Sequence, residues 1–363
     1  QLIAQRDEAA RQHMHFRPGY QRSQQRNRQM RADVDMLTRE ATATFEALQP
    51  PPEDATIRQE LMTRLTNLVS EATADAKLYP FGSSVSGLAS RGADLDLTLM
   101  PQDGDDEEMD KERQGELVER IAEVMEASGQ MEEVHARPKA RVPIVALKDK
   151  ATGLKCDICM CNKLALINSR LLRSYMQLDP RARQLAFIIK HWAKCRAVNN
   201  PYHGSPSSYA WVLCVIHYLQ TCNPPVLPVL QQLYGPTIED AKRDYRKATI
   251  VKTHDGREFD CGYCTDVQAI HDSLTQMRPL NLMPIGELLI GFFRRYAREF
   301  DFVKAVACVR TGTYMSKADK GWDKKDAGFR GDRHLFCMEV RECGENTRDA
   351  TPSHHPKSLT LCV

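Results

Sequence analysis

The stretch that decides the fold runs Phe81-Gly-Ser-Ser-Val-Ser-Gly-Leu-Ala-Ser-Arg-Gly-Ala-Asp-Leu-Asp-Leu-Thr-Leu-Met100. Its first part, Gly82-Ser83, predicts a tight turn, because small side chains let backbone N–H groups and a hydroxyl approach a phosphate closely. A helix-compatible run over 85–90 follows and would aim its positive N-terminal end at the same anion. The last part, 94–99, alternates leucines with acidic or hydroxyl side chains, which predicts a half-buried strand.

Alternation along this strand sorts its side chains between two faces. The leucines share one face, and Asp94, Asp96 and Thr98 share the other. Carboxylates at i and i+2 lie roughly 7 Å apart along the backbone, and Mg²⁺ binds one or two carboxylates together with phosphate oxygens. The alternative is an ordinary edge strand with solvated acids, since short motifs often match by chance.

A third carboxylate stands on another strand-like run, Leu154-Lys-Cys-Asp-Ile-Cys-Met160. In a strand, Asp157 lies on the face opposite its neighbours Cys156 and Ile158. A salt-bridged strand acid is the simpler interpretation of Asp157 taken alone. Its place after the Asp-x-Asp strand instead favours a site that the three acids share.

The order of Gly-Ser, short helix and Asp-x-Asp resembles the active-site signature of the nucleotidyltransferase superfamily. That superfamily includes DNA polymerase beta, the poly(A) polymerases and the terminal uridylyltransferases, and the resemblance covers roughly residues 79–349. It implies that Asp94, Asp96 and Asp157 are the catalytic acids and hold two Mg²⁺ or Mn²⁺ ions, with Asp157 on the side of the primer 3′-hydroxyl. The turn residues that it implies for nucleotide binding are Gly82, Ser83 and Ser84.

The resemblance also assigns nucleotide-binding roles on two predicted helices. Asn168, with Ser169, would read ribose hydroxyls, although an Asn-Ser pair can equally be an N-cap that opens a helix. Lys190 and Lys194, at i and i+4 on one helix face, would bind the triphosphate as point charges. A lysine pair is otherwise usually a solvated surface.

The start of a third predicted helix, Gly204-Ser-Pro-Ser-Ser-Tyr-Ala-Trp211, resembles the terminal uridylyltransferases and the related noncanonical poly(A) polymerases. Ser207 or Ser208 can cap this helix, and its N-terminus can bind an anion. Tyr209 would then stack on the nucleotide base, an interaction worth about 1–3 kcal/mol.

The family's base-reading segment matches Leu335-Phe-Cys-Met-Glu-Val-Arg-Glu-Cys-Gly-Glu-Asn346. The match gives Glu339 and Glu342 as acids that accept, through water, from uracil N3–H. It departs from the family's Asp-Pro-Phe core, which puts the identity of the base in doubt. The alternative is a solvated acidic turn.

Composition bounds the remaining possibilities. The chain has 363 residues, which predicts two lobes, and a net charge of +2, so any nucleic-acid contact must come from local patches. No apolar run approaches the roughly 20 residues of a membrane span. Because residue 1 is Gln, a cleaved targeting segment stays possible.

The 12 cysteines lie mostly inside apolar segments, which indicates reduced, buried thiols in a cytosol-like or matrix-like compartment. Cys261-Gly-Tyr-Cys264, with His254 upstream, could form half of a zinc site. A closed zinc site needs four ligands, and no second pair is evident, so buried thiols are the preferred interpretation.

Helix and strand signals divide the chain into three parts. Residues 1–50 predict helices that pack on the second lobe, and an RNA-touching arm is the alternative because arginines recur from Arg6 to Arg31. Residues 51–163 predict the catalytic domain, with amphipathic helices over 57–76 and 111–128 and strands over 134–147 and 154–160. Residues 164–363 predict a helical nucleotide-recognition domain of the poly(A)-polymerase-associated type. Residues 223–280 suggest no chemistry.

The predicted fold is therefore an α/β catalytic lobe with a small mixed sheet, plus an all-α second lobe, with the NTP in the cleft between them. The favoured function is template-independent transfer of UMP from UTP to the 3′ end of single-stranded RNA. The alternatives are a noncanonical poly(A) polymerase that uses ATP and an inactive scaffold in an RNA-processing complex. The compact form resembles the minimal trypanosomatid uridylyltransferases, which implies a mitochondrial matrix location, with the cytoplasm possible, and partners in an RNA-processing or editing complex.

Overall fold

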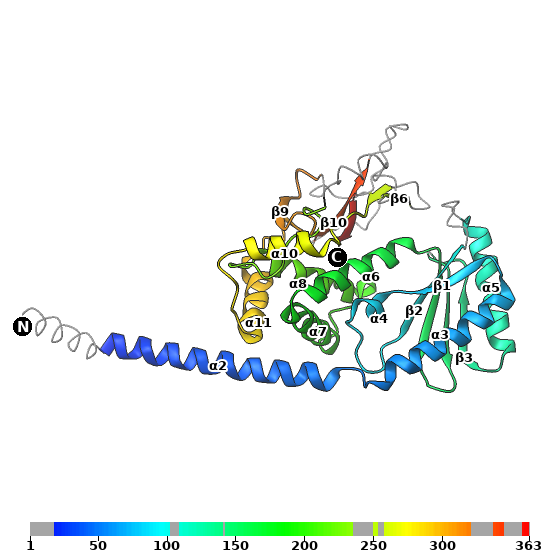
Figure 1. Ribbon diagram of the computed structural model, residues 1–363, viewed down its shortest axis with the longest axis horizontal. Coiled ribbons are helices and arrows are strands. Elements are labelled where there is room, and N and C mark those ends of the chain that lie inside the picture. Colours follow the sequence, from blue (N-terminus) through cyan, green and yellow to red (C-terminus); the bar gives the residue numbers. More distant parts are fainter. Residues whose placement is uncertain are drawn as a thin grey trace, which may run out of the picture.

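The chain forms two lobes, and one long helix runs beneath the mainly helical one (Figure 1). The structure, a computed structural model, describes residues 18–101, 109–140, 142–234, 250–252, 258–320, 337–344 and 358–362. Within these ranges only the backbone is described for residues 18–21, 202, 337, 341–344 and 358–362. No helix in these ranges is long and apolar enough to cross a membrane.

The first lobe is built on a mixed five-stranded sheet of order β1-β2-β5-β4-β3. The middle pair, β2 and β5, is parallel, and the other neighbours are antiparallel. The predicted strands over 134–147 and 154–160 are confirmed within a few residues. The strands are β1 (Ala76–Pro80), β2 (Leu95–Pro101), β3 (Met131–Arg137), β4 (Ile144–Asp149) and β5 (Lys155–Met160).

The parallel register of β2 and β5 places Asp96 directly opposite Asp157. Neighbouring strands lie about 4.8 Å apart, and paired residues point to the same face. The residues that alternate with these acids, such as Leu95, Leu97 and Ile158, are buried on the other face. The apolar half of each strand therefore turns both carboxylates away from the core.

Two helices cover the apolar face of this sheet: α3 (Glu53–Ala72) and α5 (Lys111–Ala127). Their predicted apolar stripes are confirmed, since Leu61 and Leu65 on α3 and Ile121 and Met125 on α5 are fully buried. Each such side chain contributes about 1.5–3 kcal/mol when it leaves water. Burial on one face only leaves the opposite face of the sheet available for the active site.

The second lobe contains most of the helices and a separate apolar core. Its centre is α8, with Leu213 and Ile216 fully buried. The helices of this lobe are α6 (Lys163–Leu178), α7 (Pro180–Cys195), η1 (Pro201–His203), α8 (Ser208–Thr221), α10 (Val267–Gln276), α11 (Ile285–Arg294) and the π-helical η2 (Arg295–Glu299).

A second sheet corrects the prediction of an all-α second lobe. Its strands run in the order β6-β7-β10-β8-β9, and β11 pairs with β10. Most of these strands are only three to five residues long, so periodicity along the chain gives little sign of them. The strands are β6 (Ile250–Lys252), β7 (Glu258–Asp260), β8 (Ala305–Cys308), β9 (Thr313–Ser316), β10 (Cys337–Gly344) and β11 (Ser358–Cys362).

The long helix α2 (Pro18–Leu48) runs beneath the second lobe and leads into α3 of the first (Figure 1). Its second half packs on α7 and α11. The close approach of the two helices requires glycine at position 286 of α11, because a Cβ there would collide with the Val34 carbonyl and with Thr38. The Gly286 N–H donates to Thr38 Oγ1 at 3.1 Å. The helix therefore packs on the second lobe and connects it through the chain to the first.

Candidate active site

The Gly-Ser motif opens α4 (Gly82–Ser86), a helix of only five residues. It starts three residues earlier than the predicted run over 85–90 and ends at Gly87, whose φ of +78° breaks the helix. A helix this short sums few peptide dipoles, so the predicted attraction of an anion by the helix dipole is wrong for this motif. The Phe81 N–H donates to the Asp96 carbonyl at 3.0 Å and fixes the turn beside the acids.

Gly82 is needed at this point for two reasons. Its φ of +69° lies in the left-handed region, which side chains disfavour. A Cβ on Gly82 would also collide with the Asp96 carboxylate. The turn and the acid strand therefore approach each other as closely as the backbone permits.

Asp94 lies in the loop before β2 rather than on the strand, because β2 begins at Leu95. It is exposed at the mouth of the site. Arg58 of α3 holds the loop, donating through Nη2 to the Ala93 carbonyl at 2.5 Å and through Nη1 to the Asp94 carbonyl at 3.4 Å. This positioning role could not be predicted from the sequence, since an arginine on an amphipathic helix is an ordinary surface residue.

Burial and neighbouring charges raise the pKa of two of the acids, Asp96 and Asp157. Burial, followed by the charges of Asp157 and Asp94, raises the pKa of Asp96 from 3.8 to about 6, against the opposing charges of Lys190 and Arg58. Burial and the charge of Asp94 also raise the pKa of Asp157. A half-buried group of carboxylates that resist ionisation together is a typical environment for a bound cation.

These donors fit a divalent metal ion whose coordination is completed by substrate. Among the described residues, no three His, Cys, Asp or Glu side chains converge closely enough to hold an ion by themselves. Mg²⁺ commonly takes one or two carboxylates plus substrate phosphates and waters rather than a closed protein cage. Asp94, Asp96 and Asp157 are the residues that would hold such ions.

A cleft of about 960 Å³ opens in front of the acids and is lined by both lobes. It brings together most of the residues that the sequence predicted for the site, although they are scattered over more than a hundred positions. Those that line the cleft are Gly82, Ser83, Asp94, Asp96, Asn168, Ser169, Lys190, Lys194, Ser208 and Tyr209. Ser84, Asp157, Ser207 and Glu339 do not line it.

Ser84 and Ser169 both bond within the protein. The Ser84 hydroxyl accepts from Arg58 Nη1 at 3.4 Å. The buried Ser169 hydroxyl accepts from the Gly82 N–H at 2.7 Å and donates to the Ala165 carbonyl. Ser169 therefore ties α6 of the second lobe to the Gly-Ser turn of the first, while its neighbour Asn168 lines the cleft.

The N-cap alternative for Asn168 and Ser169 is wrong. Helix α6 starts at Lys163, and its N-cap is Asn162, whose Oδ1 accepts from the Ala165 N–H at 3.2 Å. Asn168 and Ser169 stand in the middle of the helix. A role for Asn168 in reading ribose hydroxyls stays a prediction.

The two lysines of α7 face the acids from across the cleft. Lys190 is largely buried and donates to the Leu88 carbonyl at 2.9 Å. Burial lowers its pKa, and the carboxylate of Asp96 opposes that effect. Lys194, one turn later, is exposed. The pair thus supplies one positive charge close to Asp96 and a second one farther out along the cleft.

The start of α8 is confirmed as a capped helix terminus. Ser207 is the N-cap, and its Oγ accepts from the Ala210 N–H at 3.1 Å. Ser208 accepts from Asn199 Nδ2 at 3.2 Å. Tyr209 is half-buried in the cleft wall, which is compatible with stacking on a base.

Glu339 does not occupy the position that the base-reading prediction requires. Its side chain is fully buried on β10, with Arg310 Nη2 at 2.9 Å from Oε1 and Lys320 Nζ at 2.5 Å from Oε2. A carboxylate that neutralises two cations inside the protein is a structural ion pair. The side chain of Glu342 lies outside the described residues.

The structure adds cleft residues that the sequence did not suggest. Val251 and Lys252 of β6 and Phe259 of β7 form part of the wall, and Val251 and Phe259 pack together near Leu164 and Ile167 of α6. They lie in the stretch to which no chemistry was assigned. A three-residue strand carries no periodicity, so only the fold reveals them.

The half zinc site receives no support among the described residues. Cys261 and Cys264 are both buried, and no group of potential metal ligands found in the described part of the chain includes them. His254 lies outside the described residues. The preferred interpretation, buried thiols, stands.

Two family models and a solved structure show the family to which this chain belongs. A family model described as the central palm domain of mitochondrial-like poly(A) RNA polymerase matches residues 37–177, and one described as Cid1 family poly A polymerase matches residues 284–345. A solved structure of a mutant Cid1 poly(U) polymerase bound to MgATP is 30% identical, with a TM-score of 0.64, over 83% of this chain and 84% of that one. The chain belongs to the Cid1 family. Members of this family include terminal uridylyltransferases and poly(A) polymerases.

Both kinds of Cid1-family enzyme occur among its relatives in Schizosaccharomyces pombe. The terminal uridylyltransferase cid1 is 36% identical over 261 residues, which are 68% of this chain and 56% of cid1. The poly(A) RNA polymerase cid11 is 31% identical over 306 residues, which are 83% of this chain and 57% of cid11. The chain thus spans a little over half the length of these curated relatives. Membership of the Cid1 family, which holds both uridylyltransferases and poly(A) polymerases, does not choose between UTP and ATP.

Proposed function

We propose that this chain transfers UMP from UTP to the 3′-hydroxyl of single-stranded RNA without a template, with Mg²⁺ (or Mn²⁺) and release of diphosphate. The observation that carries the proposal is the parallel register of β2 and β5, which sets Asp96 beside Asp157. Facing Asp96 across one cleft are Lys190, Lys194 and Tyr209 of the other lobe. The acids suit a metal ion, the lysines suit the triphosphate, and the aromatic ring suits the base.

The residues divide the work by position. Lys190 and Lys194 attract the triphosphate, and Tyr209 presents a ring on which any base can stack. Asp94 and Asp96 stand beside the Gly-Ser turn and therefore on the nucleotide side. Asp157, on the far side of Asp96 from β1, faces the primer. When bound, two divalent ions would supply Lewis acidity to the phosphate and lower the pKa of the 3′-hydroxyl.

Use of ATP is the second candidate, and one observation favours it. Glu339 is buried in an ion pair with Arg310 and Lys320, so it is not presented to a base edge. UTP is supported by the greater identity to a uridylyltransferase, 36% for cid1 against 31% for cid11. The all-acid metal site argues against the third candidate, an inactive scaffold.

The test is extension of a short single-stranded RNA in Mg²⁺ with each of the four NTPs supplied separately. The variant with Asp94→Ala and Asp96→Ala is the control. We expect products with UTP, far more than with ATP, and none from the variant. Products mainly with ATP would replace the uridylyl proposal by the poly(A) one, and no product with any NTP would contradict both.

A further inference from the structure

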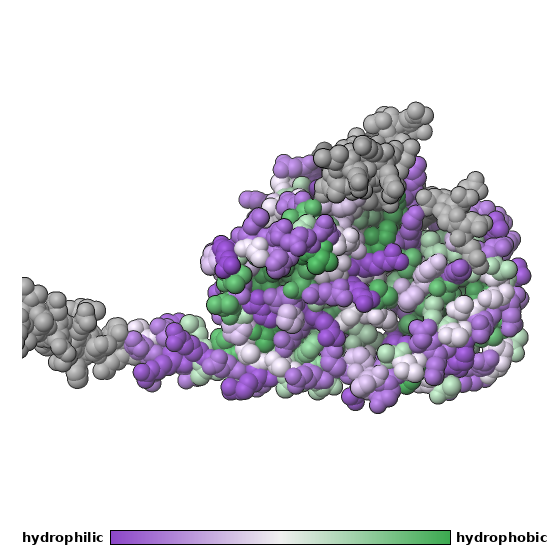
Figure 2. Space-filling view, viewed as in Figure 1, coloured by the Kyte–Doolittle hydropathy of each residue, from purple (hydrophilic) through white to green (hydrophobic). Residues whose placement is uncertain are grey.

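The first part of α2 projects from the body of the protein as an arm, here defined as residues 22–33. Every residue in the arm is exposed. Packing on α11 starts only at Val34 and Thr38, where Gly286 approaches the helix. At 1.5 Å per residue the arm is about 18 Å long. Figures 1 and 2 show it leaving the second lobe at the side opposite the catalytic sheet, with a mostly hydrophilic surface.

The arm is basic and lacks an apolar stripe. It carries Arg22, Arg26, Arg28 and Arg31, and its only acid is Asp33, at the base. Gln, Asn and Ser make up most of the rest. A partner helix or a membrane surface requires an apolar face to bury, and the arm offers none. Positive charge is therefore the property of the arm that distinguishes it as a recognition surface.

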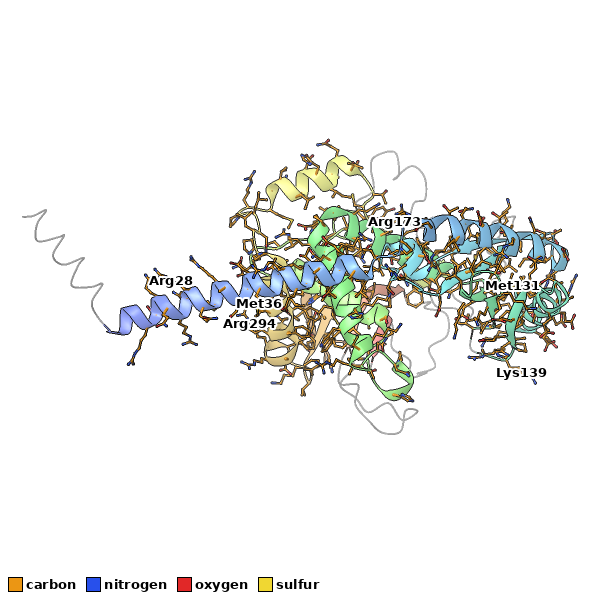
Figure 3. The ribbon with its side chains drawn as sticks, turned by 90° about the horizontal axis from the view of Figure 1, so that it is seen from below. Arg28, Met36, Met131, Lys139, Arg173 and Arg294 are labelled. Carbon is orange, nitrogen blue, oxygen red and sulfur yellow. The ribbon has the colours of Figure 1, made fainter. Side chains whose placement is uncertain are left out.

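The arginines surround the helix instead of lining one side. With 100° between successive residues, Arg26 lies about 40° from Arg22, whereas Arg28 and Arg31 lie about 240° and 180° from it. Figure 3 shows Arg28 standing clear of the helix. A flat rigid surface could meet only one or two of these groups, but a flexible polyanion can wind past all four.

We propose that the arm binds the phosphate backbone of single-stranded RNA upstream of the 3′ end that occupies the cleft. The identity of the ligand as RNA rests on the proposed function. Arginine suits the role because its planar guanidinium binds phosphate oxygens in pairs. The arm lies outside the cleft, so it adds affinity for long RNA and leaves the chemistry of the 3′ end unchanged.

The test compares the whole protein with a variant whose four arm arginines are replaced: Arg22→Gln, Arg26→Gln, Arg28→Gln and Arg31→Gln. Glutamine has a helix propensity close to that of arginine, so the arm remains helical. The matched control removes four exposed arginines elsewhere and the same total charge: Arg39→Gln, Arg120→Gln, Arg173→Gln and Arg298→Gln.

Extension is measured on a short RNA that fills only the cleft and on a long RNA that can also reach the arm. We expect the arm variant to raise KM for the long RNA about tenfold or more, and to leave KM for the short RNA and kcat for both unchanged. Each phosphate contact contributes about 0.7 to the slope of log affinity against log salt for single strands. Loss of the four should therefore reduce that slope by up to about 3 for the long RNA.

Several results would overturn the proposal. One is an equal rise in KM for the short and the long RNA. Another is an equal rise in KM for the long RNA in the control variant, because the effect would then come from the total charge of the protein and not from the position of the arm. Unchanged RNA affinity together with lost binding to anionic lipid vesicles would assign the arm to a membrane surface. Direct RNA binding by the Asp96→Asn background, measured without NTP, tests the arm even where no extension is found.

Discussion

Replacing Asp96 by asparagine should destroy activity and yet stabilise the metal-free protein. The pKa of this acid rises from 3.8 to about 6 on folding because of burial and the charges of Asp157 and Asp94. At 1.36 kcal/mol per pH unit, the ionised carboxylate therefore lowers the free energy of unfolding by about 2 to 3 kcal/mol near pH 7, after allowance for its partial contact with water. Asparagine keeps the shape and removes the charge.

The pH dependence follows from linkage. Because the folded pKa lies above the unfolded one, the folded state binds the proton more tightly, and the free energy of unfolding falls as pH rises from about 4 to about 6. The gain from Asp96→Asn should therefore be near zero below about pH 4 and complete above about pH 6.5. Added Mg²⁺ should restore stability to the wild type and much less to the variant.

The assay is urea unfolding in the presence of a chelator, at about pH 4 and about pH 7.5. Asp75→Asn, at an exposed position in the same lobe, is the matched control and should change stability little at either pH. A destabilising charge at Asp96 is excluded if Asp96→Asn is no more stable than wild type near pH 7.5. It is also excluded if the variant's free energy of unfolding exceeds that of wild type by the same amount at both pH values.

Three further predictions concern the Gly-Ser turn, the contact of α7 with that turn, and the ion pair of Glu339. Gly82→Ala should cost about 1–2 kcal/mol for the left-handed backbone and also reduce kcat by at least a hundredfold, because its Cβ displaces the Asp96 carboxylate; Gly129→Ala, with φ +65° and open space, should cost similar stability and no activity, and equal activity in both would contradict this. Arg183→Met should remove the hydrogen bonds from α7 to the Gly87 carbonyl and to Gln49, lowering stability by about 2 kcal/mol and raising KM for the nucleotide; calorimetry and steady-state kinetics check both, and an unchanged KM would count against a positioning role. Glu339→Gln should lower the free energy of unfolding by about 3 kcal/mol, because Arg310 and Lys320 lose their shared carboxylate; a shift in the ratio of UTP to ATP use with unchanged stability would instead support base reading.

The sequence predicted the parts of the site that depend on local pattern. Alternation around Asp96 and Asp157 identified the face on which each carboxylate lies, and β5 and most of β2 match that expectation. Capping chemistry predicted that Ser207 or Ser208 starts α8, and Ser207 is the N-cap. Such signals are readable because each is settled by side chains within a few residues along the chain.

Features of the site that arise from tertiary contacts could not be predicted from local sequence patterns. The parallel pairing that sets Asp96 beside Asp157 joins residues 61 positions apart. Arg58 and Phe259 acquire roles only when α3 and β7 reach the site. Glu339 looked like a base reader because its pattern matched, but its cation partners Arg310 and Lys320 come from other segments. Burial, rather than pattern, decided its role.

The most direct test of the central claim is the rate of nucleotide addition to the 3′-hydroxyl of a single-stranded RNA by wild type and by Asp157→Asn. Asp157 is the acid whose role depends on the pairing of β2 with β5 and on no local motif. We expect a loss of about a thousandfold or more, no addition to an RNA that ends in a 3′-deoxy sugar, and full activity in the Asp75→Asn control. Addition at an undiminished rate by Asp157→Asn would contradict the account.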